Sequence, residues 1–449
     1  MGSPDKLRSR HQPPVEVLRS LAAIALLGVG VGLACWPLNG IDRWQDQLIN
    51  QLPGFSSSPW HRLSLALALA PIPLVPLLLL LQAGPLRQAS GSGLPQLMEA
   101  LEHPQRSASL LAAKPTLGRL ALWAIASLGL LPLGREGPAA QLGAALAHGL
   151  GRGRLSSELL AAAAGAGLAG AFNTPLMGVV FVAEELTRSF QAALIWPALL
   201  MAAIAALVSG LAGQPLFGLG IHALAVPELD QALWAGPIGL GAGLMGALMA
   251  RLLLLARRLL QPWVWQHPLR TGLLLGIGLA LLALLSGGRS CGDGEAVLRQ
   301  LLLATTQPQP WGGWLALLVV RLLGPVLGLA AGIPGGLIDP AFALGGAFGA
   351  GIVELMGGQV WLGVVLGMAG GLAGATQLPV MSLAFTLRMA GAQQLLPGLM
   401  LAALAGALAG RWLMAVPIYR ALGEQAQNDQ TGSVPPLANA IAGSDQYKD

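Results

Sequence analysis

The sequence predicts an all-α protein that crosses a membrane many times, and three observations lead to this fold class. Charged residues make up 10% of the 449 residues and hydrophobic residues 54%, whereas an ordinary soluble domain is about 25% charged. Apolar runs of about 20 residues, the length needed to cross a bilayer, recur along the chain. Glycine and proline interrupt several of these runs, which indicates broken helices. The lipid bilayer is therefore the expected environment of the chain.

Ten apolar runs are candidates for membrane-spanning helices. They cover residues 18–37, 63–82, 109–131, 158–183, 191–213, 235–256, 270–286, 311–332, 341–377 and 395–417. The first run follows a basic stretch, as in a signal peptide, but no small-residue cleavage site comes after it. We therefore expect this run to be an uncleaved first helix.

The charges outside the apolar runs predict the orientation of the chain. Lys6, Arg8, Arg10 and Arg19 come at its start, and the positive-inside rule then places residues 1–17 in the cytoplasm. The net charge of +5 thus reflects topology, and no nucleic-acid partner is expected. Residues 421–449 form a polar tail. Cys35 and Cys291 show neither metal-ligand nor disulfide spacing, so no metal and no cofactor is expected.

The chain contains an internal repeat. Three pairs of matching positions keep nearly one offset: Pro175 with Pro379 (379 − 175 = 204), Pro138 with Pro340 (340 − 138 = 202) and Gly91 with Gly292 (292 − 91 = 201). Small residues are common in all membrane helices, so one pair alone would mean little. Three pairs in order indicate two related halves, about 18–225 and about 235–420. Many transporters are built this way, with the binding site between discontinuous helices.

Four stretches predict helix starts inside apolar sequence: "GSGLPQ" (91–96), "GREGPAAQLG" (134–143), "FNTPLMG" (172–178) and "GIPGGLIDPAFALGG" (332–346). Proline suits the first helical position, and Gly137, Thr174 and Asp339 precede prolines as candidate N-caps. Broken helices at membrane depth must be buried in protein or line a cavity. Their free N–H groups favour an anion, and Ser92 adds a hydroxyl donor.

The motifs "GSGLP", "GREGP" and "GGLIDPAFALG", in this order, with "AAAAGAGLAGAFNTPLMGVVFVAEEL" between the last two, resemble the CLC family of chloride channels and transporters. The resemblance extends from about residue 18 to 420. It implies two inverted-topology repeats of tilted and re-entrant helices. It also implies a homodimer with one pathway per subunit, in a bacterial inner membrane with both termini cytoplasmic.

The resemblance implies a chloride site. Ser92 and Tyr419 would coordinate the anion, together with backbone amides at Gly137, Leu337 and Ile338. The residues expected to support these loops are Gly91, Gly93, Pro95 and Pro138. Tyr419 has an alternative interpretation as an aromatic anchor at the membrane interface.

The glutamate of "GREGP" is the gate in this family, which implies that Glu136 occupies an anion position when ionised and leaves it when protonated. A charge at the membrane centre costs about 2.5 to 3.5 kcal/mol on insertion scales, so a functional role is expected. A purely structural pair with Arg135 is disfavoured because adjacent helical side chains do not face each other. We expect Arg135 to support the local field.

The glutamate pair in "FVAEELT" bears on proton coupling. It could be the solvated end of a helix, but by resemblance Glu185 is the proton-accepting glutamate of the family's exchangers. The predicted function is therefore exchange of chloride for protons. A passive chloride channel is the alternative, since it would share every anion-binding residue. A fluoride exporter is less favoured because the motifs have the chloride-type form.

Two positions depart from the family. Ile338 and Asp339 stand where Phe and a small or apolar residue are usual, and a carboxylate there would repel chloride unless it folds back as an N-cap, which is the preferred interpretation. Arg388 occupies the repeat position of Glu184, and the sequence offers no explanation for it. A membrane protease is disfavoured, because Ser90 and Ser290 replace glycines that the serine and aspartyl motifs require.

Overall fold

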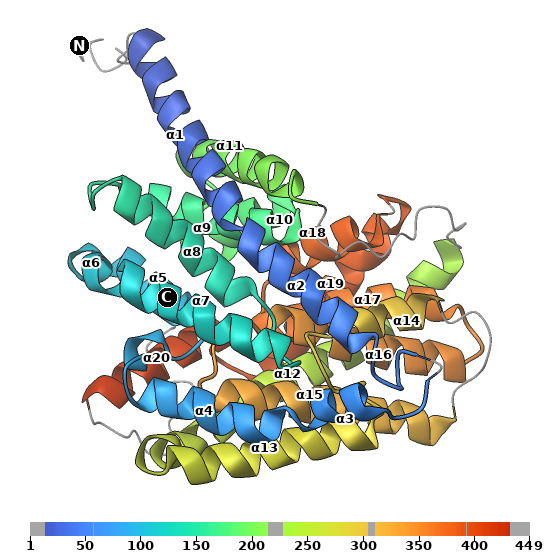
Figure 1. The fold of residues 1–449 in the computed structure, drawn as a ribbon. Helices are drawn as coiled ribbons and strands as arrows, with labels where there is room; N and C mark the ends of the chain where they lie inside the picture. The colour runs from blue at the N-terminus through green and yellow to red at the C-terminus, as the bar shows by residue number, and fades with distance from the viewer. Residues whose placement is uncertain (1–13, 57, 214–227, 304–309, 392, 432–449) are drawn as a thin grey trace.

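The computed structural model describes residues 14–56, 58–213, 228–303, 310–391 and 393–431, and these are almost entirely helical (Figure 1). The expected cytoplasmic segment falls largely on residues 1–13, the junction between the repeats on 214–227 and most of the polar tail on 432–449. These three predictions lie outside the described residues.

The first repeat comprises eleven described helices. They are α1 (Pro14–Ala34), α2 (Trp36–Ile49), α3 (Arg62–Leu69), α4 (Pro71–Ala83), α5 (Leu94–Glu102), α6 (Ser107–Leu110), α7 (Ala113–Leu128), α8 (Glu136–Leu150), α9 (Ser157–Phe172), α10 (Pro175–Phe181) and α11 (Ala192–Gly210). Short turns η1 (Arg87–Ala89) and η2 (Pro104–Arg106) flank α5, and the π-turn η3 (Val182–Leu186) extends α10.

The second repeat comprises nine described helices. They are α12 (Glu228–Gln266), α13 (Pro268–Leu285), α14 (Glu295–Leu303), α15 (Trp311–Ala330), α16 (Ile338–Leu355), α17 (Val360–Thr376), α18 (Pro379–Ala390), α19 (Leu396–Leu413) and α20 (Ile418–Thr431), with the turn η4 (Gln393–Leu395) before α19.

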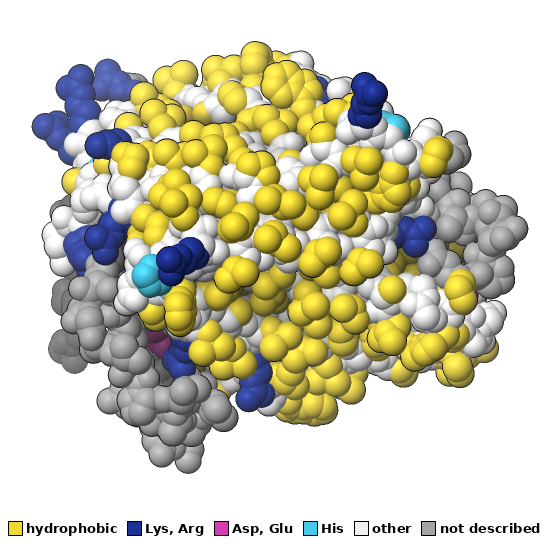
Figure 2. Space-filling model, turned by 60° about the horizontal axis from the view of Figure 1, so that its bottom comes forward, with side chains coloured by type: hydrophobic (Ala, Val, Ile, Leu, Met, Phe, Trp, Pro, Cys, Tyr) yellow, Lys and Arg dark blue, Asp and Glu magenta, His cyan; other side chains and the backbone are white. Residues whose placement is uncertain are grey.

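Eight helical stretches among the described residues are long and apolar enough to cross a membrane. They are Leu18–Ile49, Arg62–Ala83, Ala192–Gly210, Ala232–Gln266, Pro268–Leu285, Trp311–Ala330, Ile338–Leu355 and Gln393–Ala426. Hydrophobic side chains cover one face of the molecule, with most Lys and Arg towards its edges (Figure 2). On α13, for example, Leu274 and Leu285 are 72% and 83% exposed. The protein is therefore an integral membrane protein.

The predicted count of ten spans was too high because two runs, 109–131 and 158–183, contain none of these eight stretches, and the run 341–377 supplies one only in its first part, Ile338–Leu355. The run 109–131 forms α7, which has only 16 residues. The run 158–183 breaks at Asn173, whose φ of 51° ends α9, and the run 341–377 breaks at Gly357, whose φ is 75°. Backbone in the left-handed region cannot continue a right-handed helix.

Close packing of glycines joins the helices within each half. A Cβ atom on Gly143 of α8 would lie 2.1 Å from the carbonyl oxygen of Ala163 in α9. In the second repeat, a Cβ on Gly345 of α16 would lie 2.2 Å from the carbonyl oxygen of Gly367 in α17. Small residues let helix backbones approach closely. In a membrane this matters because helix association depends on van der Waals packing and not on the hydrophobic effect. The same kind of contact thus recurs at an offset of 202 (345 − 143).

The repeat is also visible in two buried arginines. Arg119 of α7 donates from Nε to the carbonyl of Gly91 at 3.1 Å, and Arg321 of α15 donates from Nη1 to the carbonyl of Gly292 at 3.2 Å. The offsets are 202 (321 − 119) and 201 (292 − 91). Each arginine therefore holds the corresponding glycine loop of its own half.

The start of the polar tail is helical, which the sequence analysis did not predict. Helix α20 continues to Thr431, and Gln425 donates from Nε2 to the carbonyl of Leu254 in α12 at 3.3 Å. Packing against α12 and α5 supplies the stabilisation that this polar sequence lacks by itself.

Candidate functional site

The four predicted helix starts are present, but two of the three proposed N-caps are wrong. Thr174 is the N-cap of α10 as expected. Helices α8 and α16 instead begin two residues before their prolines, with Arg135 and Leu337 as N-caps, so Gly137 and Asp339 are already helical. Proline is tolerated at the third position because no N–H of the first turn has an intrahelical partner.

The side chain of Asp339 does not cap α16, so the preferred interpretation of this residue was also wrong. Neither carboxyl oxygen of Asp339 has a hydrogen-bond partner among the described residues. The free backbone N–H of Asp339 instead donates to Oε1 of Glu136 at 2.7 Å. A carboxylate from the first repeat thus occupies the N-terminus of a helix in the second, a position that favours negative charge.

Two glycines make room for Glu136, which is 0% exposed. Gly134 and Gly336 exchange backbone hydrogen bonds of 3.0 and 2.9 Å across the two repeats. A Cβ on Gly336 would lie 1.1 Å from Oε2 of Glu136, and one on Gly134 would lie 2.5 Å from Oε1. Only glycine at these positions leaves space for the carboxylate. The analysis of the sequence missed Gly336, although "GG" at 335–336 was a visible signal.

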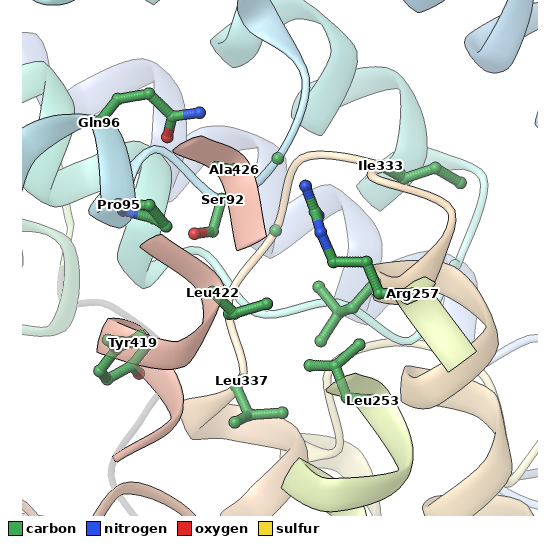
Figure 3. Close-up of a pocket in the computed structure, with 13 residues that line it drawn as sticks. Ser92, Pro95, Gln96, Leu253, Arg257, Ile333, Leu337, Tyr419, Leu422 and Ala426 are labelled. Carbon is green, nitrogen blue, oxygen red and sulfur yellow. The ribbon is translucent and has the colours of Figure 1, made fainter. Parts of the chain in front are cut away.

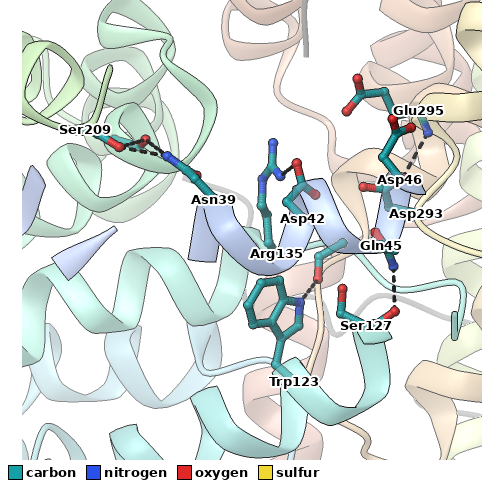
Figure 4. Close-up of polar contacts among 12 residues, drawn as sticks. Asn39, Asp42, Gln45, Asp46, Trp123, Ser127, Arg135, Ser209, Asp293 and Glu295 are labelled. Atoms are coloured by element: carbon teal, nitrogen blue, oxygen red, sulfur yellow. Dashed lines mark hydrogen bonds and ion pairs between the residues drawn. The ribbon is translucent and has the colours of Figure 1, made fainter. Parts of the chain in front are cut away.

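Arg135 is held by the first repeat. It forms a salt bridge with Asp42 of α2 (Figure 4), and its guanidinium carbon lies 4.5 Å from the ring centroid of Phe172. Its charge still acts on the Glu136 carboxyl. Arg135 therefore contributes to the local field, as expected, while its ionic partner is Asp42.

Three of the predicted anion-binding residues line one hollow (Figure 3). Ser92, Leu337 and Tyr419 line the same small, partly open cavity. The Ser92 and Tyr419 hydroxyls have no hydrogen-bond partner among the described residues. Tyr419 is only 2% exposed, which excludes the interpretation as an anchor facing lipid headgroups. Two residues with unpaired hydroxyls therefore line the same cavity, as a site for a small anion requires.

The other predicted site residues belong to the same loops and helix starts, but Gly93, Gly137, Pro138 and Ile338 do not line the cavity. A Cβ on Gly137 would lie 2.2 Å from the carbonyl oxygen of Ser92, so the start of α8 directly contacts the serine loop. Gly91 and Pro95 also line the cavity. Gly93 has a φ of 94°, which allows the turn into α5. Ile338 is fully buried at the start of α16.

Arg119 is a site residue that the sequence analysis missed. It is 1% exposed and donates to the carbonyls of Gln88 at 3.0 Å, Ser90 at 3.2 Å and Gly91 at 3.1 Å. It also bonds Oε1 of Gln141 in α8. The Arg119 guanidinium thus holds the carbonyl groups of the loop before Ser92 in place. The signal was a lone arginine inside the apolar run 109–131.

The two glutamates of η3 have different surroundings. Glu184 accepts hydrogen bonds from the N–H groups of Val380 at 3.1 Å and Met381 at 2.7 Å, so it caps α18 of the second repeat. Glu185 is 2% exposed, and its Oε1 has no hydrogen-bond partner among the described residues. A buried glutamate is not a solvated helix end. The charges of Arg188 and Arg420 act on it.

The structure also explains Arg388. Its Nε donates to the carbonyl of Asn173 at 3.3 Å, at the C-terminal end of α9. Cations are favourable at helix C-termini because the last carbonyls are unpaired and carry partial negative charge. Glu184 thus binds a helix N-terminus, whereas Arg388, at the matching position of the second repeat, binds a helix C-terminus.

Two related halves of broken membrane helices meet around a buried carboxylate and an open cavity, which defines a polytopic membrane transport protein. The chain belongs to the voltage gated chloride channel family, whose sequence pattern it matches over residues 74–411. This family consists of transporters and channels.

Relatives of known name agree with this assignment. The voltage-gated ClC-type chloride channel ClcB of Salmonella typhimurium is 30% identical over 306 residues, which cover 64% of this chain and 71% of ClcB. A CLC-type fluoride/proton antiporter superposes with a TM-score of 0.72 at 25% identity, covering 91% of this chain and 99% of that one. A slow cyanobacterial Cl⁻/H⁺ antiporter gives a TM-score of 0.73 at 22% identity, covering 92% and 99%.

Proposed function

We propose that this protein exchanges chloride for protons across a membrane and that Glu136 is the gate. The observation that carries the proposal is the hydrogen bond from the Asp339 N–H to the Glu136 carboxylate. That amide belongs to a helix N-terminus, which would otherwise bind an anion. A side chain that competes with chloride for such a site, and that can be neutralised by a proton, links the two ions directly.

Protonation opens the path in this proposal. A neutral Glu136 no longer gains from the N-terminal dipole of α16, so its side chain leaves and chloride takes its position. Ser92, Tyr419 and the amides at Leu337 and Ile338 then hold the anion. All these donors are neutral, and Arg257, which also lines the cavity, places one positive charge beside them.

In this proposal Glu185 supplies protons to Glu136 by a route separate from the anion site. The anion site offers the proton no basic group, so a second titratable side chain must exchange protons with Glu136. Glu185 is buried beside α10 and α20 and is separate from the Ser92 cavity lining. By resemblance to the family's exchangers, this end of the molecule would face the cytoplasm. We also propose a homodimer in a bacterial inner membrane.

A passive chloride channel is the second candidate, because ClcB relatives carry that name. Purified protein in chloride-loaded liposomes separates the two. A chloride gradient across an exchanger drives protons uphill, and the external pH then changes with the sign of the chloride gradient. Chloride flux with no uphill proton movement would overturn the exchange proposal and favour the channel.

A further inference from the structure

The start of α16 carries a carboxyl group that the proposed exchange mechanism does not use. Asp339 is 0% exposed, and neither of its side-chain oxygens has a hydrogen-bond partner within the described residues. Its own backbone N–H is bonded to Glu136. An unpaired ionised carboxylate in an apolar interior is very costly, so such groups bind a proton or face another charge.

Charged and titratable groups face Asp339 from several elements. The strongest electrostatic interaction is with Glu136 of α8, and the others involve Asp293 before α14, Arg135 before α8 and Asp42 of α2. Arg321 of α15 and the Tyr419 hydroxyl of α20 also interact with it. Arg135 is already bonded to Asp42. Glu136 and Asp339 are therefore like-charged neighbours, with the Glu136 carboxylate bonded to the Asp339 N–H, and interacting carboxyl pairs share a proton in preference to both ionising.

Further acidic groups, Asp293, Glu295 and Asp46, lie near one another (Figure 4). Asp293 accepts a hydrogen bond from the N–H of Glu295 at 3.0 Å. Glu295 is paired with Arg299, which also binds Asp46 at 3.0 Å. The Asp46 side chain is 18% exposed. A row of carboxyl groups thus lies between the buried gate and the partly exposed Asp46, joined through the Glu295 N–H and the Arg299 guanidinium, and buried acidic groups of this kind mark proton relays in membrane proteins.

The internal repeat explains why a carboxyl group stands at position 293. Gly91 corresponds to Gly292, so Asp293 stands where the first repeat has Ser92. Arg119 and Arg321 hold the two loops in the same way. The first repeat therefore presents a neutral hydroxyl suited to an anion, while the second presents a carboxyl, which repels anions and binds protons.

We propose that Asp339 is a second proton-carrying group, which exchanges a proton with Glu136 and passes it towards Asp293. In this step one O–H bond breaks at the Glu136 carboxyl and one forms at the Asp339 carboxylate, with no other reactant. The proposal rests on the proposed exchange of chloride for protons. It deepens that function by giving the proton a path that leaves the anion site on the side of α2 and α14.

Asp339→Asn is the main test, because asparagine keeps the size of the side chain and the backbone N–H that binds Glu136. Proton and chloride fluxes are measured in the same liposomes over a series of external pH values. We expect the ratio of protons to chloride to fall about 100-fold or more, as for loss of a proton-transfer group. Asp339→Glu restores a carboxyl and should recover part of that ratio. Glu102→Gln, at an exposed glutamate, is the matched control.

The outcomes separate this inference from the proposed function. If the wild type moves no protons uphill, the exchange function fails. If the wild type does so and Asp339→Asn keeps the wild-type ratio, the relay through Asp339 is wrong while exchange stands. Should Asp339→Asn not fold, Asp293→Asn gives the same readout one step further along the row, and an unchanged ratio there likewise overturns the relay.

Discussion

Gly134 and Gly336 form a reciprocal pair of backbone hydrogen bonds, of 3.0 and 2.9 Å, at the point where the two repeats meet. They occupy the same position in each half, at an offset of 202 (336 − 134). Each precedes a helix start, α8 or α16, by two residues. A local two-fold arrangement therefore brings the N-termini of α8 and α16 together. Only α8 carries a glutamate there, and its side chain binds the N-terminus of α16.

Replacement of Gly336 tests whether this space controls the gate. In Gly336→Ala the new Cβ would overlap Oε2 of Glu136, 1.1 Å away, so the carboxylate must leave the α16 terminus. We expect chloride flux that depends less on pH, with an overpacking cost of about 1–3 kcal/mol. Gly236→Ala, where a Cβ meets nothing within 4 Å, is the control. A Gly336→Ala crystal structure with Glu136 unmoved would contradict the interpretation.

Neutralising the gate should uncouple the two ions. Glu136→Gln keeps the shape of the side chain and removes its charge, so it imitates the protonated state. We expect chloride flux with little pH dependence and proton flux reduced about 100-fold or more, the scale for loss of a proton-transfer group. Flux assays in liposomes measure both. Wild-type coupling in this variant would show that Glu136 is not the gate.

Glu185 should matter for protons alone. Glu185→Val removes the buried carboxyl and leaves Ser92 and Tyr419 untouched, so chloride flux should persist while proton flux is lost. Glu184→Gln is a neighbouring control, because Glu184 caps α18 and its loss should cost about 1 kcal/mol of stability without uncoupling. Loss of both fluxes in folded Glu185→Val would assign Glu185 to the anion path.

The anion site can be located with bromide. Crystals soaked in bromide should show its anomalous signal within hydrogen-bonding reach of both the Ser92 and Tyr419 hydroxyls. Ser92→Ala should weaken halide binding by about 1.5–3 kcal/mol, because hydrogen bonds to charged groups contribute that much; titration calorimetry measures it. Bromide bound only elsewhere would refute the site.

Much of the fold could be predicted from local rules. Helix starts near Pro95, Pro138, Pro175 and Pro340 follow from local rules of proline placement, and the repeat follows from matching motifs. The break at Asn173 lies within the predicted helix start "FNTPLMG", but the break of the run 341–377 at Gly357, whose φ is 75°, was not predicted. Tertiary packing selects that conformation, and an apolar pattern does not reveal it.

The residues of the candidate site could be predicted where a polar side chain is unusual in its apolar surroundings. Ser92, Glu136, Glu185 and Tyr419 stand out as hydroxyls or carboxyls within apolar sequence. Asp339 was assigned a local role as a cap, because local rules consider only neighbours along the chain. Its N–H is in fact taken by Glu136, a residue 203 positions away (339 − 136).

The sequence by itself determined the class of protein: its apolar runs require a membrane, its repeat requires two halves, and its proline-marked helix starts require a buried polar site. Only the tertiary structure decided which groups meet there. Glu136 faces the α16 terminus, Arg135 binds Asp42, and Arg119 holds the serine loop because residues from separate helices converge. In a low-dielectric interior such long-range pairings set the energy of each charge, and no local pattern encodes them.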